Sequence, residues 1–266
     1  MSARGRKVAV IAGGLGLAAL YLWGASGLPP AGEYRGPYGI VLNQVAVSER
    51  HSTDIVTSVN FDYRGFDTLG EEFILFASVI GAALLLRKHK DEEEAQEKDS
   101  KDGSGEDEAA SRRPPPTSDA VRTLGVGLVG IYVVFGLYVI SHGQVTPGGG
   151  FQGGVILATA PLLVYLAGDP RRFLRVVPHT LVEVAESCGA AGFVLLGFLG
   201  LFRAGAFLQN VLPLGPPNGK ITSAGTIALI SATTGLEVAA GFVLLLSIFL
   251  EQTLQKRLKR IEREEK

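Results

Sequence analysis

A glutamate in the middle of an apolar segment is the clearest candidate for chemistry in this sequence. Glu237 lies thirteen residues from each end of Ala224–Leu250, which holds no other charged residue. A carboxylate at membrane depth costs about 2.5–3.5 kcal/mol, so it marks either function or a polar contact between helices. The residues within about 60° of it on a helical wheel are Ser223, Thr226, Thr233, Thr234 and Gly241. Two hypotheses stay open: a proton or ion relay, and a hydrogen-bonded lock between two helices.

Acidic residues also open a second apolar segment, Leu69–Leu86. Asp67, Glu71 and Ser78 share one face of a helix, and this face could form an acidic entrance for a cation. Thr68 and Glu71 have the spacing of a capping box, which would satisfy free N–H groups at the start of a helix.

A third acidic pair, Glu183 and Glu186, begins the apolar segment Leu181–Phe202. Glutamates at this end complement the helix dipole. Glu186 also shares a face with glycines suited to close helix contact, namely Gly189, Gly192, Gly197 and Gly200. The candidate ion or proton path therefore consists of Glu237, Thr233, Thr234, Asp67, Glu71 and Glu186.

A glycine-rich segment separates two of the apolar stretches. It reads Pro147, Gly148, Gly149, Gly150, Phe151, Gln152, Gly153 and Gly154. The spacing G-x-G-x-x-G binds dinucleotides only when it follows a strand within a βαβ unit. Here it follows an apolar segment of helical length, so we expect a tight packing hairpin and no nucleotide or other cofactor.

Composition excludes several other functions. His142 and His179 are isolated, and Cys188 is the single cysteine, so no metal site is expected. We find no nucleophile–base pair, and we expect no enzyme in this chain alone. The net charge of −1 leaves no basic face for nucleic acid.

The apolar stretches themselves predict an all-α integral membrane protein. Crossing about 30 Å of hydrocarbon takes about 20 apolar residues in a helix. Six stretches qualify or nearly qualify: Val8–Leu28, Leu69–Leu86, Val121–Ser141, Phe151–Gly168, Leu181–Phe202 and Ala224–Leu250. The first has an alternative, because a basic start, an apolar run and small residues at 24–27 also describe a signal peptide.

Lys and Arg residues predict the orientation of these spans. With both termini in the cytoplasm, 20 of the 25 fall on the cytoplasmic side, as the positive-inside rule requires. The basic residues on the opposite side are Arg35, Arg50, Arg64, Arg203 and Lys220.

Charge blocks divide the chain into parts. Residues 1–87 form a two-span module, 88–120 a charged linker, 121–250 a four-span domain and 251–266 a charged tail. The linker ends in three prolines and has few apolar residues, so we expect it to be disordered. Residues 53–63 alternate like a strand, whereas Thr53 and Asp54 could cap a helix, and the sequence leaves both open.

The segment Ser141–Gly154 resembles the G-H-N-x-P-G-G-G-F-Q-G-G signature of the MnhB family, whose members are components of Mrp-type sodium/proton antiporters. The resemblance extends through 223–226 and 235–238 and covers roughly 120–250. It implies four spans in this part. The sequence departs from the signature at 144–146, where Gln144, Val145 and Thr146 replace a stretch that usually contains Asn.

A second resemblance concerns Val59–Glu71. This segment is similar to V-D-F-R-G-F-D-T-L-G-E near the end of the large Mrp A protein, and to a small separate component of membrane-bound hydrogenases. The chain thus resembles a fusion of two accessory modules. This implies a bacterial or archaeal cell membrane, other membrane subunits of an Mrp-type or hydrogenase-type complex as partners, and sodium ions or protons as possible cargo. The alternative is a membrane-arm subunit of an energy-converting redox complex.

Overall fold

The computed structural model describes residues 3–28, 36–86, 118–167, 170–217 and 219–264. These residues are almost entirely helical and hold no strand. The chain divides into two compact units, Met1–Gln44 and Val45–Lys266. The predicted division at the linker remains a prediction from sequence, since the compact units divide upstream of it.

Helices account for all of the predicted spans. Their bounds are α1 Ala3–Ser26, α2 Pro37–Arg50, α3 Ile55–Ser58, the π-helix η1 Val59–Tyr63, α4 Gly65–Leu85, α7 Asp119–Ser141, α8 Gly150–Leu166, α9 Pro170–Val176, α10 His179–Ala204 and α11 Thr226–Glu264. Four are long and apolar enough to cross a membrane, namely α4, α7, α10 and the Thr226–Leu250 part of α11. Ile11–Ser26 and Gly150–Leu166 are shorter apolar helices. The all-α membrane fold is therefore confirmed.

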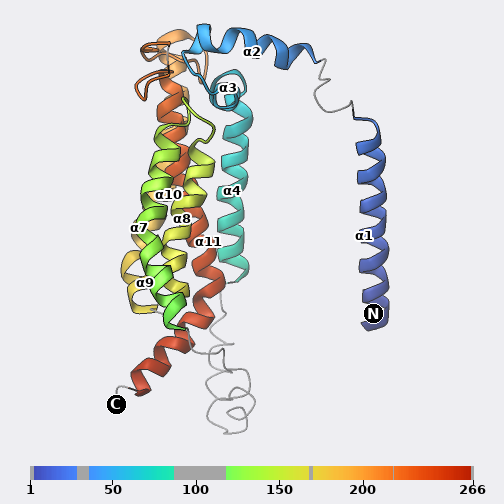
Figure 1. The fold of residues 1–266 in the computed structure, drawn as a ribbon, viewed down its shortest axis with the longest axis vertical. Helices are drawn as coiled ribbons and strands as arrows, with labels where there is room; N and C mark the ends of the chain where they lie inside the picture. Colours follow the sequence, from blue (N-terminus) through green and yellow to red (C-terminus); the bar gives the residue numbers. More distant parts are fainter. Residues whose placement is uncertain (1–2, 29–35, 87–117, 168–169, 218, 265–266) are drawn as a thin grey trace. The chain divides into compact units, whose positions relative to one another are not determined.

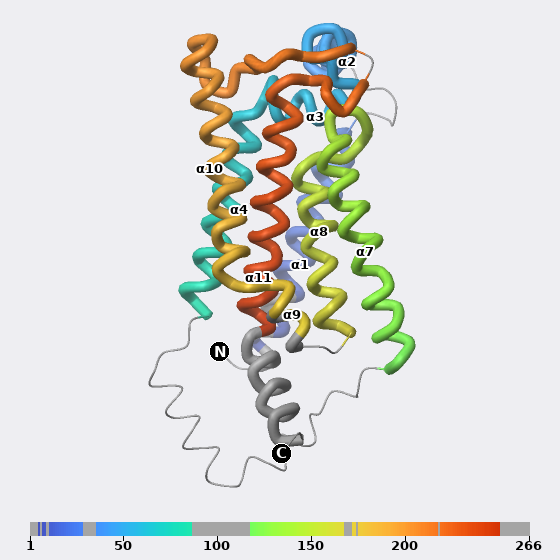
Figure 2. Tube along the Cα trace, turned by 90° about the vertical axis from the view of Figure 1, so that its left-hand side faces the viewer, coloured from blue at the N-terminus to red at the C-terminus, as the bar shows by residue number. Residues whose placement is uncertain are grey.

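The second unit is a bundle built around α11. Helix α11 packs against α8, α10 and α4, and α7 packs on α8 (Figures 1 and 2). Of the long helices, α11 is the most enclosed. In its apolar stretch of 18 residues, 44% of the residues are buried, against 17–28% in the other three helices. A carboxylate on α11 therefore faces protein rather than lipid.

Glycines let α8 enter the bundle. A Cβ at Gly150 would lie 2.8 Å from the backbone nitrogen of Gly235 on α11. A Cβ at Gly153 would lie 2.8 Å from the carbonyl oxygen of Gly136 on α7. A side chain at either position would push the helices apart.

Gln144 connects the loops at the α3 end of the bundle. Its side chain is 1% exposed, and its Nε2 donates to the carbonyl of Ile221 at 2.7 Å. Its own carbonyl accepts from Ser52 Oγ and from the backbone N–H of Thr53. One residue thus joins the segments that precede α3, α8 and α11.

Residues 55–63 are helical, so the strand alternative is wrong. Asp54 occupies the N-cap position of α3. Its carboxylate accepts from Thr57 Oγ1 at 2.6 Å, and its backbone carbonyl accepts from the N–H of Ser58. These local bonds favour a helical turn, which continues directly into η1.

Two other expectations concern the ends of the four-span domain. Most of the predicted linker, up to residue 117, lies outside the described residues. Its last residues begin α7, where Ser118 Oγ accepts from the N–H of Val121. At the other end, α11 continues without interruption into the charged tail as far as Glu264.

Candidate functional site

Three glutamates from three different helices are buried side by side in the bundle. Glu72 comes from α4, Glu186 from α10 and Glu237 from α11, and their exposed fractions are 2%, 5% and 1%. We call these three residues the glutamate row. Burial this complete is rare for a carboxylate unless it is paired.

Two glycines allow the row to form. Helix α10 approaches α11 most closely at Gly189, where a Cβ would lie 2.5 Å from the backbone nitrogen of Glu237. At Gly241, a Cβ would lie 3.2 Å from Glu186 Oε1, so the missing side chain leaves space for that carboxylate. Of the predicted seam, Gly189 and Gly192 face α11, whereas Gly197 and Gly200 face the loop that follows α10.

Most oxygens of the row lack a donor among the described residues. Within the described residues, no partner is hydrogen-bonded to either oxygen of Glu72 or Glu237, or to Glu186 Oε1. Glu72 and Glu237 instead lie within hydrogen-bonding reach of each other. Such a contact needs a proton on one of the two groups, because an ionised carboxylate only accepts.

Positions along α11 give the order of the row. Glu237 faces Glu72, and Gly241, about one helical turn further on, packs against Glu186. Glu186 also senses the charge of Glu183, three residues earlier on α10, and Glu183 pairs with His179 at 3.3 Å. The acidic groups thus run from mid-bundle to the exposed α9 end.

The predicted polar stripe of α11 divides into parts with different contacts. Ser223 and Thr226 belong to the loop end, where Thr226 Oγ1 accepts from the N–H of Val211. Thr233 donates to the carbonyl of Ile230 and packs against Gly192. Thr234 is fully buried, and its hydroxyl has no hydrogen-bond partner among the described residues. Ser223 and Thr226 are also buried, but at the loop end, so Thr234 and Gly241 are the buried members of the stripe within about one turn of Glu237.

The predicted acidic face of α4 is exposed, and its residues make different contacts instead of forming one site. Asp67 pairs with Arg64, and Ser78 donates to the carbonyl of Ile74. The capping-box hypothesis is wrong, because α4 begins at Gly65 and Thr68 lies inside the helix. Thr68 Oγ1 donates to the Asn60 carbonyl at 2.6 Å, which ties α4 to η1.

Glu72 is the candidate site residue that the sequence did not single out. It lies next to Glu71, which the sequence analysis selected because Thr68 and Glu71 have the spacing of a capping box. The signal was present in the burial pattern of α4, since Thr68, Leu69, Glu72 and Val79 recur at helical spacing and are all buried. Glu72 is the one charged member of that stripe.

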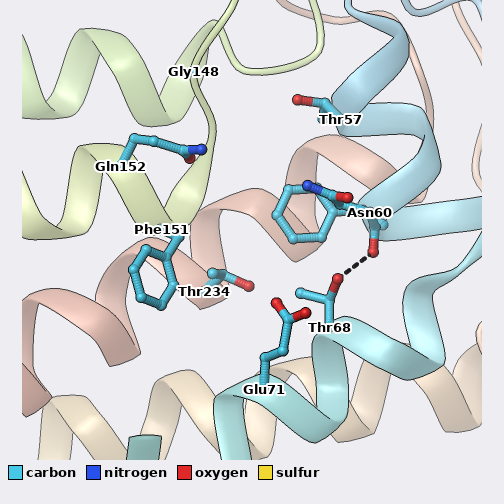
Figure 3. A pocket seen from close by; sticks show the side chains of 9 residues that line it. Thr57, Asn60, Thr68, Glu71, Gly148, Phe151, Gln152 and Thr234 are labelled. Carbon is cyan, nitrogen blue, oxygen red and sulfur yellow. Dashed lines mark hydrogen bonds between the residues drawn. The ribbon is translucent and has the colours of Figure 1, made fainter. Parts of the chain in front are cut away.

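A cavity of about 220 Å³ opens beside the row, toward the α3 end (Figure 3). Its polar lining comes from Thr57, Asn60, Thr68, Glu71, Gln152 and Thr234. Gly148, Phe61 and Phe151 complete the wall. Glu71 and the glycine hairpin therefore meet here, although they are far apart in sequence. Thr234 lies one turn before Glu237, so α11 connects the cavity to the row.

A second group of charges lies at the α3 end, outside the spans. Arg50 Nε is 2.8 Å from Asp62 Oδ1, and the Arg50 guanidinium lies 4.8 Å from the centre of the Tyr63 ring. Tyr63 donates to Glu49 Oε2 at 2.8 Å. Burial and then this hydrogen bond raise the pKa of Tyr63 to about 12. We call Glu49, Arg50, Asp62 and Tyr63 the outer cluster.

Two relatives are similar to this chain in sequence. An uncharacterized protein of Methanocaldococcus jannaschii is 27% identical over 229 residues, which are 83% of this chain and 85% of that protein. The B component of the Na⁺/H⁺ antiporter of Alkalihalophilus pseudofirmus is 33% identical over 80 residues, or 30% of this chain. The match spans 55% of that antiporter component.

Two solved structures are also similar. A chain of the membrane-bound sulfane sulfur reductase, an archaeal respiratory membrane complex, aligns with a TM-score of 0.68 and 29% identity, covering 91% of this chain and 98% of that one. A chain of the Mrp complex from Dietzia aligns with a TM-score of 0.67 at 20% identity, over 93% of this chain and 26% of that one. The second likeness shows the fold alone.

These matches and the apolar helices agree with a multi-pass protein of a prokaryotic cell membrane. The two similar structures are both of multisubunit membrane complexes. Residues 120–244 match the family described as a domain related to the MnhB subunit of Na⁺/H⁺ antiporters. This chain is therefore a membrane protein that contains, at residues 120–244, a domain related to the MnhB subunit of Na⁺/H⁺ antiporters.

Proposed function

We propose that this chain is an accessory subunit of a multisubunit cation/proton antiporter, and that its glutamate row carries protons. The observation that carries the proposal is that Glu72 and Glu237, two buried carboxyl groups, lie within reach of each other and have no other donor among the described residues. Neighbouring titratable groups in a dry site are typical of proton paths in membrane proteins. Other subunits of the complex would then be its partners.

The row suggests a direction for the path. A proton enters at the cavity beside Thr234 and is shared by Glu72 and Glu237. A rotamer change of Glu237 passes it to Glu186 of α10, which lies against Gly241, one turn further along α11. Glu183 and His179 are half-exposed or more, at 54% and 67%, and accept it at the α9 end. The distribution of Lys and Arg assigns that end to the cytoplasm.

Variants of the paired carboxyls test the proposal in the assembled complex. Glu72→Gln or Glu237→Gln retains the shape and most of the hydrogen bonding but cannot exchange a proton. We expect cation-driven proton movement in membrane vesicles to fall at least tenfold, with subunit assembly preserved. The matched control is Asp119→Asn, which removes an acidic group at the start of α7, away from the row.

The alternative role as a helix lock predicts the opposite pattern. A lock tolerates Glu237→Gln, while Glu237→Leu disrupts assembly because Glu72 loses its partner. Normal transport with Glu237→Gln would reject the proton path.

A second candidate is a membrane-arm subunit of a redox-driven complex, in which this chain alone would again have no catalytic role. The observation in its favour is the alignment over 98% of a chain of the sulfane sulfur reductase complex. The subunits that co-purify with this chain distinguish the two. Iron–sulfur proteins in the purified complex would favour the redox assembly, and their absence the antiporter.

A further inference from the structure

We infer that the cavity beside the row is a binding site for a monovalent alkali cation. The inference deepens the proposed function, on which the role of the cation in transport rests, but binding itself does not depend on a working proton path. The cavity lies between η1, α4, the glycine hairpin and α11 (Figure 3). A π-helix such as η1 often marks a functional site.

The first argument is the chemistry of the lining. The hydroxyls of Thr57 and Thr68 already donate, to Asp54 Oδ2 and to the Asn60 carbonyl, both at 2.6 Å. Each hydroxyl oxygen therefore keeps only lone pairs for the cavity. Together with the carboxylate of Glu71, these oxygens form a ligand set that suits a hard cation.

The second argument comes from a buried oxygen without a partner. Thr234 has an exposed fraction of 0% and lines the cavity, yet its Oγ1 has no hydrogen bond within the described residues. Leaving a buried hydroxyl unsatisfied destabilises a fold, because the group has lost its hydrogen bonds to water. A cation, directly or through a water of its shell, satisfies that oxygen. This observation is independent of the carboxylate of Glu71.

Charge decides which ion the cavity takes. Glu71 is the one ionisable side chain in the lining, and no Lys, Arg or His lines it to balance an anion. A divalent cation such as Ca²⁺ is usually held by several carboxylates among its six to eight oxygen ligands. A single negative charge matches a monovalent ion. At about 30 Å³ per water, a cavity of about 220 Å³ also accommodates part of the hydration shell.

Sodium binding to the full chain in lipid nanodiscs tests this assignment. We expect the protein to broaden the ²³Na NMR line, and added Li⁺ or K⁺ to reverse the broadening by competition. The sodium affinity should fall at least tenfold in Glu71→Gln. Thr234→Val should weaken it several-fold, and Thr234→Ser should restore it. Asp119→Asn, outside the cavity, should bind as the wild type does. Circular dichroism checks whether each variant is folded. Any variant that is not folded is replaced by Gln152→Leu, which removes another polar group of the cavity and should also weaken binding.

Three outcomes would overturn the inference. These are the absence of saturable sodium binding, binding unaffected by both Glu71→Gln and Thr234→Val, and displacement of sodium by micromolar Ca²⁺. Glu237→Gln separates this inference from the proton path. It should lose transport while still binding sodium, so failure of one proposal leaves the other measurable.

Discussion

The glutamate row and the outer cluster place acidic groups in opposite environments. In the outer cluster, Asp62 pairs with Arg50, and Glu49 accepts from the Tyr63 hydroxyl. In the row, Glu72 and Glu237 face each other, and no cationic side chain among the described residues pairs with them. Evidently the same residue type performs different tasks at the two places.

The difference indicates which acidic groups are structural. A carboxylate that is paired with Arg keeps its charge and fixes the elements around it. A buried carboxylate beside another carboxylate is satisfied only by a proton that it can also release. We therefore expect changes in the outer cluster to affect stability, and changes in the row to affect proton movement.

The largest effect should come from disturbing the geometry of the row without removing a carboxyl. Gly189→Ala places a methyl group against the backbone of Glu237, at 2.5 Å from its nitrogen. Backbone atoms cannot rotate away, so α10 must shift. We expect the free energy of unfolding to fall by an amount near the upper end of the usual cost of overpacking, which is about 1–3 kcal/mol. Transport should also be reduced. Thermal unfolding in nanodiscs and proton uptake measure the two effects.

The control for Gly189→Ala is Gly130→Ala on α7, where nothing lies within 4 Å of the added methyl group. In the isolated chain this variant should be as stable as the wild type. Equal losses in both variants would contradict the close approach of α10 to α11.

A smaller effect is expected from the outer cluster. Asp62 has a side-chain exposure of 9%, and Asp62→Asn removes the closer of the two carboxylates beside the Arg50 guanidinium, leaving Glu49 at 4.0 Å. We expect a loss of about 1–2 kcal/mol in unfolding free energy. Transport per assembled complex should stay within twofold of the wild type. A tenfold loss of transport without loss of stability would erase the distinction between the two regions.

The smallest effect concerns Tyr63 and depends on pH. Folding raises the pKa of Tyr63 from 10.0 to about 12, so the neutral phenol stabilises the fold fully below pH 10 and this contribution disappears as the pH rises through 12. Tyr63→Phe should cost about 0.5–1.5 kcal/mol at pH 8. The difference in stability between the two proteins should shrink as the pH rises from 10 to 12. Unfolding measured from pH 8 to 12 follows this, with the exposed Tyr38→Phe as control.

Much of the fold could be predicted from local sequence. An apolar run of helical length must be helical in a bilayer, because backbone polar groups find no other partner there. The predicted bounds Val121–Ser141 agree with α7 Asp119–Ser141 to within two residues. Residues 53–63 could not be assigned, since their alternation fits a strand, whereas the helix depends on side-chain bonds around Asp54.

The candidate site was only partly predictable. Glu237, Glu186, Thr234 and Glu71 were identified from their positions in or beside apolar runs. The sequence could not say that Asp67 would pair with Arg64 at the surface, or that Glu71 would face a cavity. Nor could it bring the glycine hairpin beside η1, because that proximity depends on loops joined through Gln144.

The sequence by itself determined that a carboxylate lies at the middle of a span, since depth in a membrane follows from counting residues along a helix. The tertiary structure decided which carboxylates meet. Glu71 and Glu72 are adjacent, and consecutive residues on a helix point about 100° apart. The packing of α4 on α11 turns Glu72 inward to Glu237 and leaves Glu71 at the cavity. That rotation is fixed by contacts between helices, and no local pattern contains it.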